Sequence, residues 1–290
     1  MKRDELESQF RRLGLDAGDI VFVHSSLGSI GYVEGGADTV VDALLGVLGD
    51  DGTLVVPTFT FGQQDRPFNP ATDPSGMGRI SETVRTRPQA LRSIHRSHSV
   101  AAIGRQAETI TSVHGPAALA ADGPFGQLYA LDARILLLGV SYQTCTFLHV
   151  AELLVQVPYR QSERRQDRVL EADGRQRPLM TDAHKQTADF PGNDFNKFGR
   201  IMEERGLVHI YPVGNAMARL FKARDALPLG IECYRQDPLI FVIDNDHFDF
   251  TPLRDGVALA ARMGPGVEFK GVRYVVDPQA VFNEQDREQG

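Results

Sequence analysis

Apolar and polar residues in the first part of the chain alternate between helical and strand spacing. Leu6, Phe10 and Leu13 recur at helical spacing, which predicts a short amphipathic helix before the next glycine. The runs 19–24 and 53–57 are short and apolar, as in buried strands. A helix is predicted between them, with an apolar face formed by Val41, Leu44, Leu45 and Leu48. This strand–helix–strand succession predicts an α/β fold with a partly parallel sheet that carries helices.

The rest of the chain predicts more short elements joined by polar segments. Residues 61–77 are rich in Gly, Pro, Asp and Gln and predict a long surface loop. After Pro158 the sequence becomes polar, with a hairpin-like turn at Ala172-Asp173-Gly174. No repeat, low-complexity tract or linker divides the chain, so one domain is expected. The remaining predicted elements are strands at 99–104, 134–140, 240–243 and 274–276, a helix at 194–205, and a strand followed by a helix within 213–227.

Composition and charge narrow the classes of function. The chain has 290 residues, 42% of them hydrophobic, and a formal net charge of −7, so no nucleic-acid surface is expected. Four arginines lie between Arg160 and Arg168, but Glu163 and Asp167 lie among them, which predicts a solvated loop or edge. The charged N-terminus and the lack of an apolar run of about 20 residues predict a cytoplasmic protein without a membrane span. Two cysteines do not predict a disulfide framework.

The segment with the most chemical content is 144–154, which follows the apolar strand 134–140. His149 and Glu152 are three residues apart on the predicted helix, so they share one face among apolar neighbours. A histidine oriented by a carboxylate is a common general base. Thr144 and Thr146 are candidate N-cap residues of the same helix. The alternative is an ordinary helical ion pair, and the spacing alone leaves both interpretations open.

A second candidate site follows the first predicted strand. His24, Ser25, Ser26 and Leu27 lie at its carboxyl end, where open α/β sheets bind ligands. Serine hydroxyls and the helix start at Gly35-Gly36 would suit phosphate oxygens. The glycine pair does not match a dinucleotide fingerprint or a P-loop. The serines could equally cap a turn.

Three further candidates carry weaker signals. His95 and His98 could hold zinc with Glu152 or Asp249, although their spacing is not that of a helical metal site. Residues 139–143 lack the second glycine of a nucleophile elbow. Cys145 precedes His149 by four residues, which favours a packing or turn role over an acyl-enzyme.

Taken together, four segments resemble the aminoglycoside 3-N-acetyltransferase (antibiotic N-acetyltransferase) family in order and spacing. The match is good over residues 5–160 and looser around 213–223. The four segments are 18–27, 35–59, 92–104 and 137–152.

The resemblance implies one three-layer α/β/α domain over residues 1–290 with a central mixed, partly parallel sheet. In this arrangement 1–160 form the coenzyme-binding and catalytic half, and 161–290 form the substrate-side half. It implies acetyl-CoA as co-substrate, no metal, and His149 and Glu152 as the catalytic pair. The residues assigned to coenzyme binding are His24, Ser25, Ser26, Leu27, Gly35, Gly36, Thr58, His98 and Ser99, and those assigned to the substrate are Thr146 and Asp194.

The implied substrate is the 3-amino group of an aminoglycoside antibiotic, attacked directly without an acyl-enzyme. A polycationic amine favours an acidic pocket, for which the sequence offers Asp182, Asp189, Asp194 and the cluster 244–249. The oxyanion donors are expected from backbone N–H groups near Thr146 or from the Thr58 hydroxyl. A non-antibiotic amino sugar as acceptor, a metal-dependent hydrolase, a non-catalytic binding relative and a homodimer stay open at this stage.

Overall fold

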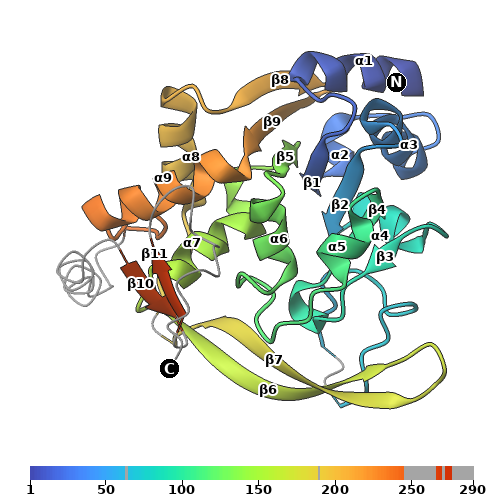
Figure 1. Ribbon diagram of the computed structural model, residues 1–290. Coiled ribbons are helices and arrows are strands. Elements are labelled where there is room, and N and C mark those ends of the chain that lie inside the picture. The colour runs from blue at the N-terminus through green and yellow to red at the C-terminus, as the bar shows by residue number, and fades with distance from the viewer. Residues whose placement is uncertain (63–64, 189, 245–265, 270–271, 276–290) are drawn as a thin grey trace.

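Seven strands form the central sheet, in the order β3-β4-β2-β1-β5-β9-β8 (Figure 1). The computed structural model describes residues 1–62, 65–188, 190–244, 266–269 and 272–275. β1 pairs in parallel with β2 and β5, and every other neighbouring pair is antiparallel, so the predicted mixed, partly parallel sheet is confirmed. The strands are β1 (Ile20–Ser25), β2 (Thr53–Pro57), β3 (Leu91–Arg92), β4 (Val100–Gly104), β5 (Arg134–Leu138), β8 (His209–Val213) and β9 (Ala216–Lys222).

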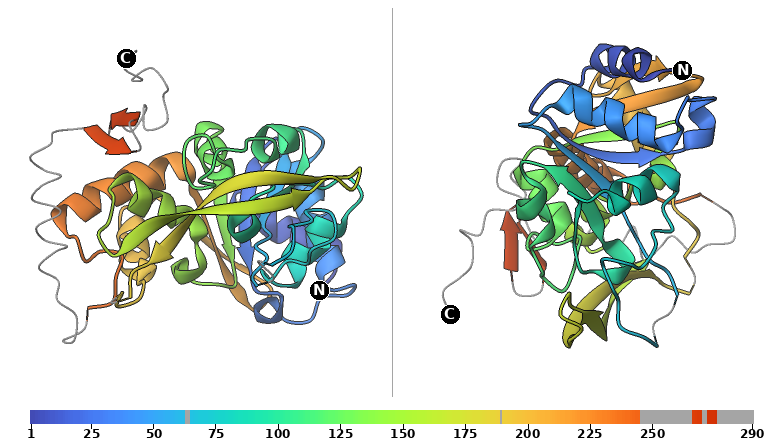
Figure 2. Two further views of the ribbon diagram at one scale, coloured as in Figure 1. Left: turned by 90° about the horizontal axis from the view of Figure 1, so that it is seen from below. Right: turned by 90° about the vertical axis from the view of Figure 1, so that its right-hand side faces the viewer.

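Helices cover both faces of this sheet because successive strand residues point to opposite sides. In β1, Val21 and Val23 pack with the first group of helices, whereas Phe22 packs with the second. Two apolar cores therefore lie on the two faces, as a three-layer fold requires (Figure 2). The first group is α1 (Arg3–Leu13), α3 (Ala37–Leu48) and α4 (Arg79–Thr86), and the second is α5 (Ala107–Thr111), α6 (Pro124–Ala130), α7 (His149–Leu154), α8 (Phe195–Glu204) and α9 (Ala223–Gln236).

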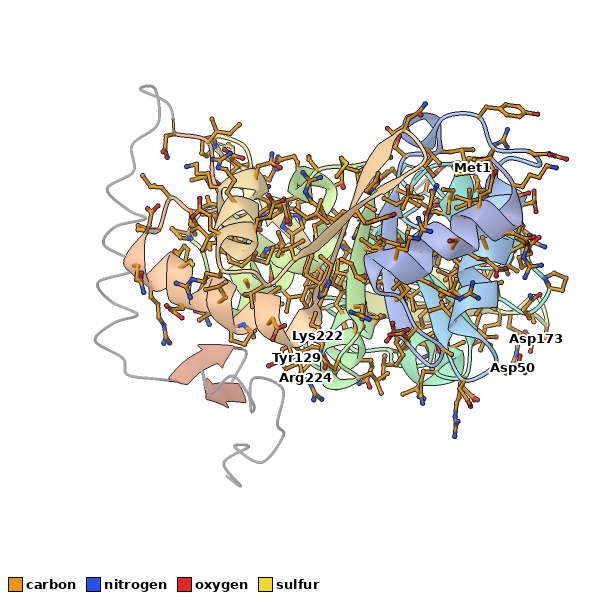
Figure 3. All side chains as sticks on the ribbon, turned by 90° about the horizontal axis from the view of Figure 1, so that it is seen from above. Met1, Asp50, Tyr129, Asp173, Lys222 and Arg224 are labelled. Carbon is orange, nitrogen blue, oxygen red and sulfur yellow. The ribbon has the colours of Figure 1, made fainter. Side chains whose placement is uncertain are left out.

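Short connections complete the two layers. The four-residue helix α2 (Leu27–Ile30) follows β1, and Gly139 follows β5 with a φ of 71°. A Cβ at Gly139 would lie 2.8 Å from the Ser29 Cβ, so only glycine lets the exit of β5 pass this close to α2. In the second group of helices, the Arg224 guanidinium donates to the carbonyls of Tyr129 and Ala130, which joins the start of α9 to the end of α6 (Figure 3).

A long hairpin lies beside the sheet and forms a separate two-stranded sheet (Figures 1 and 2). Its strands are β6 (Arg160–Leu170) and β7 (Gln176–Gln186), and the predicted turn at 172–174 joins them. The arginine-rich segment, expected in a solvated loop or edge, is this exposed strand. Its backbone bonds Phe68, which anchors the loop 61–77 against the hairpin. β10 (Gly266–Phe269) and β11 (Val272–Val275) form a further antiparallel pair.

Several sequence predictions are confirmed, and the structure differs from the rest in three places: two predictions are wrong and one strand was not predicted. The helix at 3–13 buries Leu6, Phe10 and Leu13 as expected. The strand predicted at 240–243 is instead a turn with one bridge between Val242 and Asn193, because these residues pack beside α8 and α9 rather than along a sheet edge. Strand β8 was not predicted, because its sequence HIYPV contains Pro212.

The third difference concerns the start of α7. Neither Thr144 nor Thr146 caps this helix, which begins at His149 without a side-chain cap. Two 3-10 turns, η2 (Tyr142–Thr144) and η3 (Thr146–Leu148), precede it. Leu148 is already helical, with φ −66° and ψ −21°, so the position before His149 lacks the extended backbone of an N-cap.

Within the described residues, the longest and most apolar helices are still too short or too polar to cross a bilayer.

Candidate active site

His149 and Glu152 form the centre of the candidate site. The chain leaves the carboxyl end of β5, passes through η2 and η3, and enters α7 with His149 as its first residue. The helical spacing brings His149 Nδ1 to 2.6 Å from Glu152 Oε2, so the predicted contact is present. The Glu152 side chain has no exposed surface, whereas the His149 side chain keeps 21% of its own. The imidazole is therefore partly accessible, while its Nδ1 is held by the Glu152 carboxylate.

The Glu152 carboxylate has three further donors. Oε1 accepts from the Tyr159 hydroxyl at 3.1 Å and from Asn193 Nδ2 at 2.8 Å. Oε2 accepts from Arg160 Nε at 2.7 Å. Burial would raise the pKa of this carboxyl, but the charge and hydrogen bond of His149, with the charges of Arg160 and His184, lower the pKa to about 2. Glu152 is therefore ionised near neutral pH and can only accept.

This carboxylate decides the tautomer of His149. Since an ionised carboxylate has no proton to donate, the hydrogen in the 2.6 Å contact belongs to His149 Nδ1. Nε2 of a neutral His149 then has a free lone pair. An imidazole in this tautomer is chemically equipped to accept a proton.

Three other histidines surround this pair. His24 lies at the end of β1, His98 ends η1 (Arg96–His98), and His184 lies on β7, with its ring centroid 6.2 Å from that of His149. Burial lowers the pKa of His24 and of His184 to about 3, with the charge of His149 adding to both shifts, and burial lowers the pKa of His98 as well. These rings are neutral near pH 7. His24 Nε2 and both ring nitrogens of His184 are buried without a hydrogen-bond partner, although His184 Nε2 lies 3.9 Å from Glu152 Oε2.

The sequence assigned His24, Ser25, Ser26 and Leu27 to coenzyme binding, and only His24 lies in the histidine cluster. Ser25 and Leu27 are half-buried at the end of β1 and the start of α2. The Ser26 amide donates to the Leu138 carbonyl and its hydroxyl accepts from Ser29. Ser26 is the N-cap residue of α2, but its side chain makes no capping hydrogen bond to the helix backbone.

Four other residues assigned to the coenzyme lie outside the cluster. Gly35 and Gly36 lead into α3, on the sheet face opposite to that of Phe22. Thr58 and Ser99 are fully buried, bond each other at 3.1 Å, and both accept from Arg92 Nε. These hydroxyls are used inside the protein, so the packing does not favour Thr58 as an oxyanion donor or Ser99 as a coenzyme contact.

The two residues assigned to substrate have different positions. Thr146 lies in η3, three residues before His149, with 9% of its surface exposed. Asp194 caps α8 by accepting from the Asn196 amide, so it has a structural role at the helix start. Among the acidic candidates, Asp182 pairs with Arg164 and Asp244 pairs with Lys197. Asp189 and residues 245–249 lie outside the described residues.

The weaker candidates do not assemble into sites. His95 Nδ1 accepts from the His98 amide, and no group of three metal-ligating side chains occurs in the part of the chain that the structure describes. Asp249, the alternative to Glu152 as the third zinc ligand, lies outside the described residues. Cys145 is fully buried, and burial raises the pKa of its thiol to about 12. The packing role favoured for Cys145 fits this environment.

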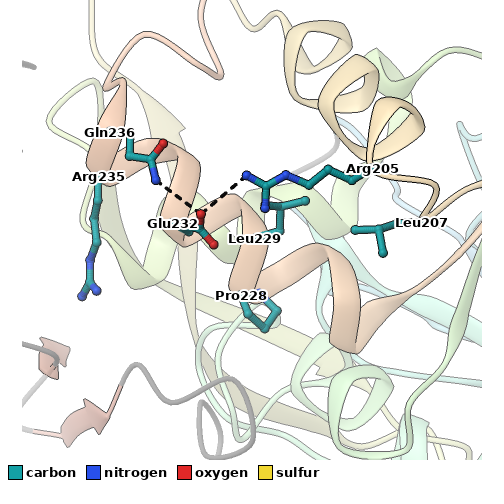
Figure 4. Close-up of a pocket in the computed structure, with 7 residues that line it drawn as sticks. All are labelled: Arg205, Leu207, Pro228, Leu229, Glu232, Arg235 and Gln236. Atoms are coloured by element: carbon teal, nitrogen blue, oxygen red, sulfur yellow. Dashed lines mark hydrogen bonds and ion pairs between the residues drawn. The ribbon is translucent and has the colours of Figure 1, made fainter.

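Two pockets are found away from the His149 ring. One of about 440 Å³ lies between η1, the loop after β2 and the hairpin, and its wall contains Arg96, Asp167 and Glu163. It adjoins the cluster, because Arg96 and Ser97 line it and His98 follows them. The second, of about 460 Å³, lies between the end of α8 and α9, where Arg205 pairs with Glu232 (Figure 4). None of the site residues predicted from the sequence lines the second pocket.

Four residues around Glu152 were missed from the sequence. Tyr159 and Arg160 lie seven and eight positions after Glu152, and a chain reversal at Val157-Pro158 could have suggested their return. His184 and Asn193 reach the site through the hairpin and the segment after it, and no local pattern announces them. Because both belong to 161–290, the site is built from both halves of the chain rather than from 1–160 alone.

Comparisons with known proteins show the family to which the chain is similar. A sequence model of the family described as "Aminoglycoside 3-N-acetyltransferase" matches residues 22–235. Aminoglycoside N(3)-acetyltransferase IV from Salmonella sp is 35% identical over 254 residues, which are 83% of this chain and 90% of that protein.

Solved structures are similar over the same length. A histidine-to-alanine mutant of aminoglycoside acetyltransferase AAC(3)-IVa in complex with gentamicin superposes with a TM-score of 0.71 at 33% identity, covering 84% of this chain and 92% of that one. The same mutant in complex with apramycin gives 0.70 at 33% identity, with coverages of 83% and 94%. The chain therefore belongs to the aminoglycoside 3-N-acetyltransferase family.

Proposed function

We propose that this protein transfers the acetyl group of acetyl-CoA to the 3-amino group of an aminoglycoside, with His149 as general base and Glu152 as its orienting partner. The observation that carries this proposal is the 2.6 Å contact between His149 Nδ1 and a buried, ionised carboxylate. It leaves Nε2 of an accessible imidazole as a proton acceptor. Acetyl-CoA supplies the activated acetyl group, and this chain supplies the base and the orientation.

The proposed proton transfer uses His149 Nε2 as the acceptor. An alkylammonium must lose a proton before its nitrogen can attack a thioester, and His149 Nε2 accepts that proton. The new C–N bond forms as the C–S bond breaks, the imidazolium returns its proton to the leaving thiolate, and the second proton that the nitrogen must lose to become an amide passes to water. Glu152 stays ionised throughout, because its pKa is far below neutral, and it stabilises the imidazolium. Such a base contributes about 10²- to 10⁴-fold to the rate.

The substrate class is supported by the relatives rather than by the pocket alone. The AAC(3)-IVa mutant is bound to gentamicin in one structure and to apramycin in another, so 3-amino aminoglycosides are the first acceptors to consider. For the coenzyme, the support is the family's acetyl-transfer activity and the position of His24 and His98 beside His149. An amino sugar outside the antibiotics remains the second choice of acceptor.

The test is a thiol-release assay with acetyl-CoA and a panel of gentamicin-type and apramycin-type amines and simple amino sugars. We expect release with at least one aminoglycoside, and mass spectrometry should find one acetyl group on the product. Release only with amino sugars would replace the acceptor and keep the reaction. No release with any amine, while acetyl-CoA binds and the protein is folded, would contradict the proposed function.

A further inference from the structure

Asn193 bridges two groups, Arg160 and Glu152, that also pair directly through one hydrogen bond. Its amide oxygen accepts from Arg160 Nη2 at 2.5 Å, and its Nδ2 donates to Glu152 Oε1 at 2.8 Å. Arg160 Nε bonds the other carboxylate oxygen, Oε2, at 2.7 Å. The guanidinium fork is therefore split between a carboxylate and an amide.

This arrangement differs from the usual pairing of these groups. A guanidinium and a carboxylate prefer two parallel hydrogen bonds, one to each oxygen. Here the Asn193 amide occupies both positions that the second bond would need, Arg160 Nη2 and Glu152 Oε1. The Tyr159 hydroxyl also bonds Oε1, so this oxygen is held from two sides.

The position of the carboxylate matters because Oε2 is shared. It accepts from both His149 Nδ1 and Arg160 Nε. If Arg160 turned to engage both oxygens, the carboxylate would rotate toward the guanidinium and its bond to His149 would lengthen. The Glu152 side chain has no exposed surface and that of Arg160 keeps 6%, so water would not readily replace a lost partner of the carboxylate.

The geometry points to Asn193 as a positioning residue that keeps Arg160 from forming a two-bond pair with Glu152 and so keeps Glu152 bonded to His149. This inference rests on the proposed function, since it assigns the support of the same base. Asn193 is itself well placed for this task. Its backbone carbonyl accepts from the Gln143 amide group, its Nδ2 also reaches the Phe241 carbonyl, and it bridges to Val242.

The test is a double-mutant cycle on acetyl transfer, with Asn193→Ala, Arg160→Lys and the double variant. Removing a group that orients a catalytic ligand typically costs about 10- to 100-fold, and we expect Asn193→Ala to lower kcat by that factor. Lysine has a single ammonium and cannot form the two-bond pair. In the Arg160→Lys background, Asn193→Ala should therefore cost less than about threefold. Equal costs in both backgrounds would overturn the inference.

Two controls separate positioning from loss of structure. Asn196→Ala changes a nearby asparagine whose backbone N–H bonds Asp194 and whose side chain does not bond Glu152, and it should leave kcat and the melting temperature unchanged. Binding of free coenzyme A by calorimetry should be within about twofold of wild type in Asn193→Ala. If that variant does not fold, Asn193→Asp keeps its shape and its bond to Arg160. It replaces the donor to Glu152 with an acceptor, so it should also lose activity.

A spectroscopic measurement tests the inference without any acceptor amine. In protein labelled with ¹⁵N-histidine, the His149 Nδ1 proton bonded to Glu152 should give a slowly exchanging resonance, assigned by its absence in His149→Ala. We expect Asn193→Ala to weaken or remove this resonance and Asn196→Ala to preserve it. An unchanged resonance in Asn193→Ala would overturn the inference even if the proposed acetyl transfer is absent, and the wild-type assay alone would decide the reaction.

Discussion

The negative charge of Glu152 has a cost that its neighbours offset. A fully buried carboxylate is unfavourable unless it is paired and hydrogen-bonded, and here four donors surround it. Among its neighbours, the charge and hydrogen bond of His149 and the charges of Arg160 and His184 explain why its pKa falls to about 2 despite burial. In the proposed mechanism Glu152 is therefore a permanent acceptor, and His149 is the group that takes up and releases the proton.

Glu152→Gln tests this role. The amide nitrogen of glutamine is a donor, so it would face His149 Nδ1–H or Arg160, which are also donors. We expect kcat to fall by at least about 10- to 100-fold, as for other groups that orient a catalytic side chain, with little change in coenzyme A affinity. Steady-state kinetics and calorimetry provide both measurements.

Glu203→Gln is a matched control. Glu203 also accepts from a tyrosine hydroxyl, Tyr142, and from an arginine, Arg219, but it has no histidine partner. Equal losses of activity in the two glutamine variants would contradict the special role of Glu152.

At this scale, the sequence predicted the local part of the site. His149 and Glu152 are three positions apart on one helix, so their contact follows from helical geometry alone. Asn193 lies 41 positions from Glu152 and His184 reaches the site through strand pairing in the hairpin. Neither position is set by a local repeat, which is why they could not be predicted. Thr58 and Ser99 show the opposite case, in which polar residues near a strand end turned inward to bond Arg92.

Among the elements, the loop after β2 is held to the sheet by one side chain of β3, that of Arg92. Arg92 Nη1 donates to the carbonyl of Asp73 at 2.6 Å, Nη2 bonds the Thr58 carbonyl and the Thr60 hydroxyl, and its ring contact is with Phe68. Burial lowers the pKa of Arg92 to about 10, so it is still charged near neutral pH. This arginine therefore joins the start and the end of the loop to the sheet.

Arg92→Lys should release that loop. A lysine cannot bond all of these acceptors at once, and each buried hydrogen bond lost costs about 1–3 kcal/mol. We expect a lower free energy of unfolding and faster hydrogen exchange across residues 65–77. Arg105→Lys, in a pair with Asp51 whose side chains are both mostly exposed, should change neither. Unchanged exchange in Arg92→Lys would show that the loop is held by other contacts.

Element prediction succeeded where burial gives a clear period and failed where tertiary contacts decide. Strands β1, β2 and β5 are buried apolar runs and were predicted close to their observed bounds. The apolar residues 240–243 look the same in sequence, yet they fill space beside α8 and α9 as a turn. A short apolar run cannot by itself distinguish a strand from such a packed turn.

At the scale of the whole molecule, the buried histidines couple folding to pH. Burial lowers the pKa of His24 and His184 to about 3 and of His95 to about 4, and it lowers that of His98 too. Below the ordinary histidine pKa of about 6.5, the unfolded chain binds protons that the folded protein does not. Stability is therefore lost as the pH falls from about 6.5 toward these lowered values.

We expect the melting temperature to fall steeply between about pH 6.5 and pH 4. Each histidine that stays neutral adds about 1.4 kcal/mol per pH unit to the slope of the unfolding free energy. Glu152 adds its own loss only at lower pH, as the pH falls from its ordinary pKa toward about 2. Denaturant titrations across this range give the slope, and His184→Gln should flatten it. A stability that does not change between pH 6.5 and pH 4 would contradict the neutral state of these rings.

The measurement that tests the account most directly is the single-turnover rate of acetyl transfer. In separate reactions, wild type or His149→Ala, in excess over acetyl-CoA, would be mixed with a saturating gentamicin-type amine. If His149 is the general base, the variant should bind coenzyme A normally but transfer the acetyl group about 10²- to 10⁴-fold more slowly. A rate within a few-fold of wild type would show that His149 is not the base.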